Sequence, residues 1–547
     1  MATVQTVGVS QTQEQVVVAF PNPVKGVIQG VSEIDLPTDA LWIGENLHFF
    51  EGECRQRPSW NLKRDTGLAT LPTALTTPVG LFTGHRATTR DQFVLVGGTN
   101  RVYVYADAQI AGLDNIASPA WNLVKAWATT NARTAQVRFT EIATGTPLVT
   151  DVVVCNSVDV PFRFTLSSPT SGWTTPTNLS IPNSATPKDA CTSSDRIIVL
   201  TDTEAYWSGN LSFTFGATSV KSFAESLDLA IAIRPFGSLN VGVWKERSIW
   251  AGIARGGADA AYFSWRLFKW VDGPAAPNAL VTDTTGSWYW ITRTGRVVKM
   301  AADSFEVTYP GDGVWPIVRK EIASTFAGYA ISHAVYRPIH DEVWFFYSTG
   351  TVIDRAIVLC HAGSDHPAAF IANFVSAFDP GVSARISENR ATTTNYEDEA
   401  AVVTVETNPT LYVAQELQAT GTDTFTTLVQ TGLQSARGPA PKGSLAAAPR
   451  GDTHRLESAE VFLRRGAGVH PGTATINLSP ISSSILDVQA GTIGTAVAIP
   501  GLNSTSPVKA VTGLSATGRF FGYKMTGANA DSIIRYLGAY LRGRRTT

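Results

Sequence analysis

The sequence contains few charged residues and few cysteines. Only 16 % of its 547 residues are Asp, Glu, Lys or Arg, and such a low content argues against long, solvated helices. The formal net charge of −2 excludes a chain that binds nucleic acid or acidic membranes through overall charge. Cys54, Cys155, Cys191 and Cys360 are far apart and form no CxxC pair. They predict reduced core thiols rather than a disulfide framework or a zinc site.

Long apolar runs are also missing. No stretch approaches the roughly 20 apolar residues of a membrane helix, and even the apolar segment 227–243 contains Asp228 and Arg234. The first residues, Met1 to Gln5, lack the basic and apolar regions of a secretory signal. We therefore expect no membrane-spanning segment and folding in a reducing cytoplasm.

Glycine (46), proline (29) and tryptophan (14) are plentiful, and a hairpin-like pattern recurs about every 45 to 60 residues. In each copy a short apolar or aromatic run meets a polar or glycine-containing turn and is followed by a second apolar run, which is typical of antiparallel strands. The clearest copies begin near Phe93, Val152, Arg196, Val241, Trp288 and Val343.

A period of about 40 to 50 residues is that of one four-stranded propeller blade. The sequence therefore predicts an all-β protein with a β-propeller of six or seven blades. Residues 1–60 do not fit the repeat and are expected to form an extended N-terminal segment. The propeller is expected over 61–433. After an irregular Pro- and Ala-rich stretch, the strand spacing shortens, which predicts a β-sandwich over 434–547.

No catalytic motif is present: the sequence lacks a GxSxG elbow, a Walker loop, HExxH and a GxGxxG before a helix. His361, Asp365 and His366 are spaced so that a folded-back loop would hold a metal, but a polar inter-strand loop is the simpler interpretation. Propeller glycosidases place two carboxylates at the central channel. The acidic candidates all lie in expected turns, where Asp is common anyway: Asp283, Asp303, Asp341 and Glu342.

The basic and aromatic clusters can each be interpreted either as a binding surface or as ordinary structural residues. The C-terminal arginines would meet phosphates or an acidic neighbour, or form a solvated tail: Arg535, Arg542, Arg544 and Arg545. The tryptophans would stack bases, but their position in alternating strands favours packing between blades: Trp244, Trp250, Trp265, Trp270, Trp288 and Trp290. We predict no catalytic, cofactor-binding or metal site.

One segment goes beyond generic β-sheet. Residues 39–47 (DALWIGENL) lead into 51–60 (EGECRQRPSW), where Arg57-Pro58 would fix an extended corner. This resembles the entry motif of β-propeller proteins in the virions of tailed bacteriophages, although Ser59 stands where that family often has Gly. Later stretches resemble the same group: 334–338 with 341–347 as a late-blade hairpin, and, as a C-terminal sandwich, 431–443, 455–463, 518–521 and 538–545.

The resemblance implies structural work in the virion. Family members form rings, often six-fold, as the nozzle or hub of a short tail or as plugs that retain packaged DNA. We therefore expect a homo-oligomeric ring that acts without catalysis in genome retention, ejection and host entry. The implied partners are portal-adaptor or neck proteins, tail fibres or spikes, and DNA that passes without sequence-specific binding. The alternative is a glycan-binding or glycan-cleaving propeller that recognises the host surface.

Overall fold

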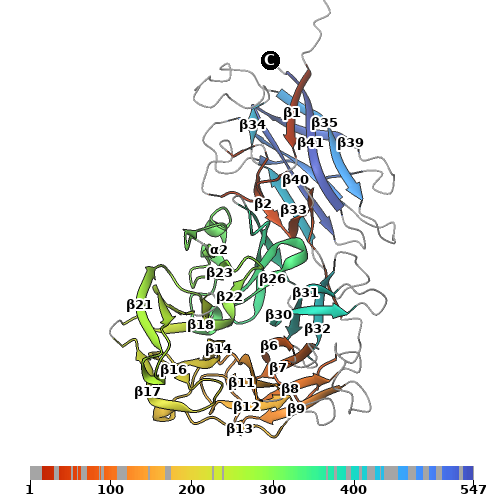
Figure 1. The fold of residues 1–547 in the computed structure, drawn as a ribbon. Coiled ribbons are helices and arrows are strands. Elements are labelled where there is room, and N and C mark those ends of the chain that lie inside the picture. Colours follow the sequence, from red (N-terminus) through yellow and green to blue (C-terminus); the bar gives the residue numbers. More distant parts are fainter. Residues whose placement is uncertain are drawn as a thin grey trace, which may run out of the picture. The chain divides into compact units, whose positions relative to one another are not determined.

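The computed structural model confirms a nearly all-β protein (Figure 1). It describes residues 15–21, 23–29, 36–37, 39–50, 53–57, 59–62, 70–85, 87, 92–106, 120–145, 148–166, 174–224, 227–236, 240–302, 304–364, 367–374, 378–389, 396–405, 409–415, 426–431, 433–435, 454–465, 476–484, 492–499, 508–528 and 534–545. The chain forms two compact units, one made of Met1–Arg57 with Phe425–Thr547 and the other of Pro58–Thr424.

The described residues of the larger unit, Pro58–Thr424, form seven four-stranded antiparallel blades, so this unit is a seven-bladed β-propeller (Figure 1). Blade 1 consists of β6 (Pro78–His85), β7 (Gln92–Gly98), β8 (Arg101–Ala106) and β9 (Ala120–Ala126). Blade 2 consists of β10 (Arg138–Thr144), β11 (Val149–Cys155), β12 (Phe162–Leu166) and β13 (Thr177–Asn178). Blade 3 consists of β14 (Asp189–Ser193), β15 (Arg196–Leu200), β16 (Glu204–Ser208) and β17 (Phe215–Ser222).

Blades 4 to 7 follow in chain order. Blade 4 consists of β18 (Ala230–Phe236), β19 (Asn240–Lys245), β20 (Ser248–Ala254) and β21 (Phe263–Trp270), and blade 5 of β22 (Leu280–Thr282), β23 (Trp288–Ile291), β24 (Val297–Met300) and β25 (Val307–Thr308). Blade 6 consists of β26 (His333–Arg337), β27 (Glu342–Ser348), β28 (Ile353–Cys360) and β29 (Ala368–Asn373). Blade 7 consists of β30 (Pro380–Asn389), β31 (Tyr396–Thr404), β32 (Leu411–Gln415) and β5 (Ser59–Leu62).

Short helices occur in the connections. These are η1 (Pro182–Ser184), η2 (Asp259–Ala261), η3 (Pro277–Ala279), α2 (Trp315–Glu321), α3 (Phe326–Tyr329) and η4 (Pro338–His340). Of these, η3 precedes blade 5, and α2 and α3 lie between blades 5 and 6. Among the described residues, no helix is long and apolar enough to cross a membrane.

The middle strands of blades 1 to 6 coincide with the six recurring hairpins. In blade 1, Val94 pairs with Tyr105, and in blade 5, Trp288 pairs with Met300. These strands are covered on both faces by neighbouring blades, so they read as continuous apolar runs; all five residues of β15, for example, are buried. The hairpin signal in the sequence is therefore the signature of the second and third strands of a blade.

Blade 7 is closed by a strand from the other end of the propeller sequence. β5 pairs with β32 from Gln415↔Ser59 to Tyr412↔Leu62. Trp60 on this strand is fully buried, and its ring meets Trp344 edge-on at a centroid distance of 5.4 Å. Closure of the ring by an early strand leaves the last blade complete and seals the propeller into a cooperative body.

The smaller unit consists of two sheets. One has the order β3 (Leu47–Phe50), β4 (Glu53–Gln56), β41 (Ile534–Arg545), β35 (His454–Arg465), β39 (Val508–Gly518), with β1 (Gln15–Pro21) also on β41. The other contains β2 (Leu41–Glu45), β33 (Thr426–Thr431), β40 (Phe520–Ala528), β36 (Ile476–Ser483), β37 (Thr492–Ile493), β38 (Val497–Ala498) and β34 (Gln434–Ser435). The sheets pack face to face through Phe20 and Tyr523, whose ring centroids are 5.2 Å apart, as in a sandwich.

This arrangement moves the expected segment boundaries. The described strands within residues 1–60 are not a separate extended segment, because β1 pairs along β41 and β2 pairs with β33. The physical reason is that edge strands of the C-terminal sheets need partners, and N-terminal strands supply them. Ser59–Leu62 belongs to the propeller, and β33, expected in the propeller, belongs to the smaller unit.

The segment that resembled the phage entry motif folds into β2, β3 and β4. Asn46 takes a left-handed conformation with φ 57° between β2 and β3. The Arg57 guanidinium is buried, and its Nε donates to Asn46 Oδ1 at 2.9 Å, while the Arg57 backbone N–H donates to the Asn46 carbonyl at 2.9 Å. The Arg-Pro corner expected from sequence therefore begins at an arginine that fixes the turn; Pro58 itself lies outside the described residues.

The four cysteines are free and buried. Burial raises the pKa of the Cys54, Cys155 and Cys191 thiols far above its ordinary value. A thiol that does not ionise is a poor nucleophile and metal ligand. The expectation of scattered core cysteines is therefore confirmed.

Candidate functional site: the axis of the propeller

The first strands of the blades form the inner ring of the propeller. β30, β6, β10, β14 and β18 contact one another in succession, and β26 contacts both β22 and β30. Two features lie on this axis: a polar network that joins several first strands, and a cavity lined mainly by the first strands of blades 4 to 7.

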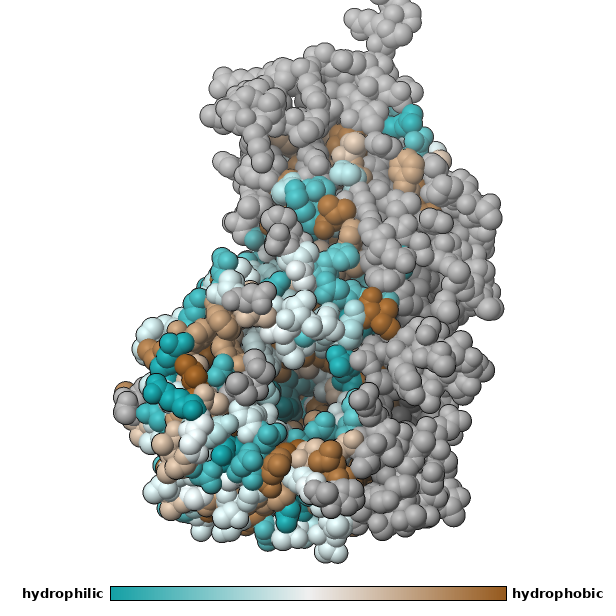
Figure 2. Space-filling view, viewed as in Figure 1, coloured by the Kyte–Doolittle hydropathy of each residue, from teal (hydrophilic) through white to brown (hydrophobic). Residues whose placement is uncertain are grey.

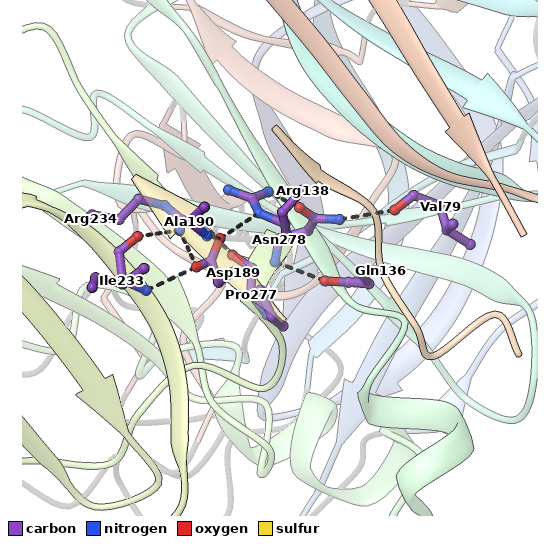
Figure 3. Close-up of polar contacts among 9 residues, drawn as sticks. All are labelled: Val79, Gln136, Arg138, Asp189, Ala190, Ile233, Arg234, Pro277 and Asn278. Carbon is purple, nitrogen blue, oxygen red and sulfur yellow. Dashed lines mark hydrogen bonds and ion pairs between the residues drawn. The ribbon is translucent and has the colours of Figure 1, made fainter. Parts of the chain in front are cut away.

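Asp189, the first residue of β14, is the centre of the polar network (Figure 3). Its carboxylate is fully buried. Oδ1 accepts from Arg138 Nε at 2.9 Å and from its neighbour's N–H, that of Ala190, at 3.0 Å; Oδ2 accepts from the Ile233 N–H at 2.9 Å and from Arg234. One carboxylate thus holds the first strands of blades 2, 3 and 4 together.

The two arginines carry the network across the axis to the connection before blade 5. Arg234 Nη2 donates to the Pro277 carbonyl at 2.5 Å, and Arg138 Nη1 donates to the Asn278 side chain. The Asn278 amide Nδ2 reaches the Val79 carbonyl in β6 at 3.3 Å (Figure 3). Short helix η3, which lies between blades 4 and 5, is therefore bonded to blade 4 and also to blades 1 and 2.

The residues that precede β10 complete the crossing. Gln136 Oε1 accepts from the Asn278 N–H at 2.9 Å, and Gln136 Nε2 donates to the Ser332 carbonyl before blade 6 at 3.2 Å. Arg133 makes a two-pronged pair with Asp379 before blade 7, with both N···O distances at 2.7 Å. Interblade connections from around the ring thus bond to one another across the axis, and we name these residues together the axial staple: Val79, Arg133, Gln136, Arg138, Asp189, Ile233, Arg234, Pro277, Asn278, Ser332 and Asp379.

The axial staple has more positive than negative charge around Asp189. Burial lowers the pKa of Arg234, the nearby charge of Arg138 lowers it further, and Asp189 opposes both. One carboxylate shared by two guanidinium groups leaves a net positive charge in a poorly solvated place. This positive charge interacts electrostatically with any ligand that approaches Arg234.

A cavity of about 580 Å³ lies on the axis beside Arg234. Figure 2 shows a hollow at the centre of the propeller in this view, bordered by both hydrophilic and hydrophobic surface. The cavity is lined by residues of β18, β22, β26 and β30, with two residues from the turn and start of β23: Arg234, Pro235, Leu280, Val281, Thr282, Gly286, Trp288, Ala334, Val335, Tyr336, Ala384 and Arg385. None of these described lining residues is acidic.

Glu141 in β10 is the titratable group of the inner ring with a strongly shifted acid pKa. Burial raises its pKa to about 7, although the His85 N–H, which donates to Oε2 at 3.2 Å, lowers it in part. Glu141 does not line the cavity. A lone carboxyl of this kind affects how stability depends on pH, without a partner carboxylate for glycoside chemistry.

Three of the four acidic residues considered as channel carboxylates are used in turns and strands. Asp283 accepts the Thr285 and Ser287 N–H groups, at 2.8 and 2.9 Å, in the first turn of blade 5. Asp341 accepts the Gly363 N–H at 3.0 Å, and Glu342 is fully buried against Arg337 at 3.4 Å. None of these three lines the cavity, and Asp303 lies outside the described residues.

The possible metal loop is only partly described: His361 has a left-handed conformation with φ 52°, and Asp365 and His366 lie outside the described residues. In the part of the chain that the structure describes, no group of three His, Cys, Asp or Glu side chains is placed to hold a metal. His333, by contrast, is a buried structural residue. Its Nε2 donates to the Pro380 carbonyl at 2.8 Å, its Nδ1 accepts from Ser383 at 2.7 Å, and burial lowers its pKa to about 3.

The tryptophans mostly pack between blades. Trp244 and Trp290 are fully buried and their centroids lie 6.3 Å apart, whereas Trp270 is 68 % exposed. Trp288 packs against Trp244 at 5.1 Å and also lines the cavity. Of the C-terminal arginines, Arg542 pairs with Glu460 at 2.7 Å; the side chains of the other three lie outside the described ones.

Sequence reasoning did not find the axial staple. Asp189, Arg138 and Arg234 occur singly, at the start or in the middle of first strands, and no spacing connects them. The one signal of these residues in the sequence is a charged residue inside an apolar stretch, such as Arg234 in 227–243. Such a stretch is expected to be buried, and a buried charge needs a partner.

Comparisons with known proteins add little beyond the fold. No protein-family model matches the sequence, and no curated protein matches it. Among solved structures, the chain is similar to YCF48 bound to D1 peptide, with 11 % identity over 66 % of this chain and 99 % of that one and a TM-score of 0.36. It is also similar to the WD40 domain of Toxoplasma gondii coronin, with 8 % identity over 73 % and 91 % and a TM-score of 0.38. Neither likeness bears on function.

Proposed function

We propose that the protein is a structural component of a tailed-bacteriophage virion, a nozzle or hub subunit that forms a closed ring around the DNA exit path. It serves genome retention, ejection and host entry without catalysis. The sequence resemblance suggests the class, and one structural observation carries the mechanism: the axial staple makes the propeller a rigid, internally bonded body.

The axial staple bears on where DNA would pass. Residues that precede β10 bond to connections before blades 5, 6 and 7, so side chains and backbone cross the axis. A DNA duplex, whose major groove alone is about 12 Å wide, does not fit through such an axis. This supports the proposal that the path lies in the hole of a ring of several subunits.

A ring of identical subunits requires two different complementary patches on each copy. A propeller presents the turns between its strands at both ends, and these offer patches without altering the blades. The formal net charge of −2 suits a conduit that DNA passes without being held. The remaining surfaces would bind portal-adaptor or neck proteins and tail fibres or spikes.

Electron microscopy of the purified full chain, alone and mixed with virion neck proteins, tests this proposal. We expect a closed ring whose central hole admits duplex DNA, and labelled antibody against the chain on the tail of intact particles. A chain that stays monomeric under both conditions, or that is absent from particles, would overturn the proposal.

The second candidate, host-surface glycan binding, is favoured by the cavity on the propeller axis. A glycan-cleaving activity is not favoured, because both retaining and inverting glycosidases need a pair of carboxylates and the described lining has none.

A further inference from the structure

We propose that the axial cavity is a binding site for an acidic sugar, a pyranose carboxylate presented as one or two units of a glycan. This inference rests on the second candidate function, glycan binding in the same cavity, and not on the ring-forming role in the virion.

The size of the cavity suits a small ligand. A volume of about 580 Å³ falls in the range of roughly 300 to 1,000 Å³ that is typical of ligand pockets. The axial staple lies beside the cavity at Arg234, so a long polymer cannot thread through the propeller. A terminal unit or a short branch can enter.

The charge of the lining selects an anion. Arg234 and Arg385 are its charged members, and no acidic residue accompanies them among the described lining residues. Arg234 shares its carboxylate partner, Asp189, with Arg138, so one carboxylate serves two guanidinium groups beside the cavity. A guanidinium group binds a carboxylate through two parallel N–H···O bonds, which favours this anion geometrically as well as electrostatically.

The backbone of the lining suits hydroxyl groups. β18, β22, β26 and β30 are each the first strand of their blade, and among the described strands each is paired along one edge only. Edge strands present alternating N–H donors and C=O acceptors, and a hydroxyl group both donates and accepts. A sugar, which carries hydroxyls around its ring, matches such a wall better than a purely apolar anion does.

The remaining walls are apolar and aromatic. Leu280, Val281, Ala334 and Val335 supply short aliphatic surface, and Trp288 supplies a half-buried indole. The C–H face of a pyranose packs against surfaces of this kind, so one wall holds the ring while the arginines hold the carboxylate. Ligand pockets commonly combine such an apolar lining with a few placed polar groups.

Isothermal titration of the full chain tests the proposal, with digalacturonate as the acidic probe and the neutral disaccharide galactobiose as its matched control. AMP is a third probe, because it is a ring-bearing anion with a phosphate in place of a carboxylate. We expect digalacturonate to bind at least tenfold more tightly than either of the others and its affinity to fall as salt rises.

Two variants locate the binding. Arg385 is exposed in the cavity lining, so Arg385→Gln should leave the fold intact and weaken digalacturonate binding about tenfold or more, as expected for loss of a charge-assisted bond. Arg266→Gln, on the exposed face of β21 away from the cavity, is the matched control and should change nothing.

Three results would overturn the proposal. The first is that digalacturonate does not bind at millimolar concentration. The second is that digalacturonate binds no more tightly than galactobiose, or less tightly than AMP. The third is that the Arg385→Gln variant melts like the wild type and binds digalacturonate with unchanged affinity. All three outcomes are independent of whether the chain forms a ring.

Discussion

Removing the charge of Asp189 should destabilise the propeller more than any other single charge neutralisation in the axial staple. Asp189→Asn keeps the shape of the side chain but removes the negative charge that lies between Arg138 and Arg234. An amide can accept through one oxygen only, whereas the carboxylate accepts four hydrogen bonds through two. The variant therefore leaves the buried guanidinium group of Arg234 and the partly buried one of Arg138 close together without a counter-charge.

The expected cost follows from this geometry. Breaking a buried ion pair by removal of one partner costs about 3–5 kcal/mol, because the remaining charge stays buried. The propeller contains Pro58–Thr424, and an unfolding entropy of about 2.1 cal/mol/K per residue gives roughly 0.8 kcal/mol/K. The melting temperature of the propeller should thus fall by about 4–6 °C.

Differential scanning calorimetry of the full chain measures the effect, with Asp202→Asn as the matched control. Asp202 lies in the same blade and pairs with Lys188, but its side chain is 65 % exposed, so its loss should cost at most about 1 kcal/mol. A double variant, Asp189→Asn with Arg138→Gln, should recover part of the loss because it removes one of the two opposed cations. Equal effects of Asp189→Asn and Asp202→Asn, or no recovery in the double variant, would refute the reasoning.

Three further variants test the closure of the ring, the pH response and the contact between blades. Trp60→Ala should destabilise the propeller by about 3–5 kcal/mol, whereas Trp270→Ala, at a side chain 68 % exposed, should stay within about 0.5 kcal/mol in denaturant titrations. Burial raises the pKa of Glu141 from 4.5 to about 7, so between these pH values the folded chain retains a proton that the unfolded chain releases, and this contribution to stability is present below pH 4.5 and lost as pH rises to 7. Glu141→Gln cannot titrate, so the melting temperature of the wild type should fall relative to that of the variant as pH rises from 4.5 to 7; a difference that does not change with pH would contradict the reasoning. Gly97→Ala should cost about 1–3 kcal/mol, because its Cβ would lie 2.5 Å from a methyl carbon of the next blade, while Gly350→Ala meets no atom within 4 Å and serves as its control.

The propeller was predictable because the middle strands of a blade are apolar on both faces. Each recurring hairpin found in the sequence is the second and third strand of one blade, such as β7 with β8 and β27 with β28. First and fourth strands give a weaker signal, since one edge of the first strand faces the axis and the fourth is exposed. β21, with exposed Leu267 and Trp270, is an example.

The seventh blade was not among the six legible hairpins for a related reason. Its second strand, β31, begins Tyr-Glu-Asp-Glu, so charge interrupts the apolar run. Its fourth strand, β5, is separated from β32 by most of the chain, and no local pattern reveals a pairing over that distance. A pairing between strands so far apart in the sequence depends on the whole fold that brings them together, and not on either segment alone.

The axial staple was beyond local patterns as well. Asp189 gains its role because three first strands converge at one place, and convergence is set by the number and tilt of the blades. The cavity is the same kind of feature: Arg234 and Arg385 are 151 positions apart in the sequence and line one space only because blades 4 and 7 surround the same axis. Single polar residues in otherwise apolar first strands are the only trace that such sites leave in the sequence.

The two proposals make different use of the same axis. The axial staple bonds connections from opposite sides of the ring, so the blades cannot open without breaking buried charged contacts. A body of this kind transmits force as a unit, which suits a ring subunit in a particle that ejects its genome. The cavity beside the staple remains open to small ligands, and the staple supplies the guanidinium group of Arg234 to its wall. Rigidity and an anion-selective site therefore have a common physical origin in two arginines that share one buried aspartate.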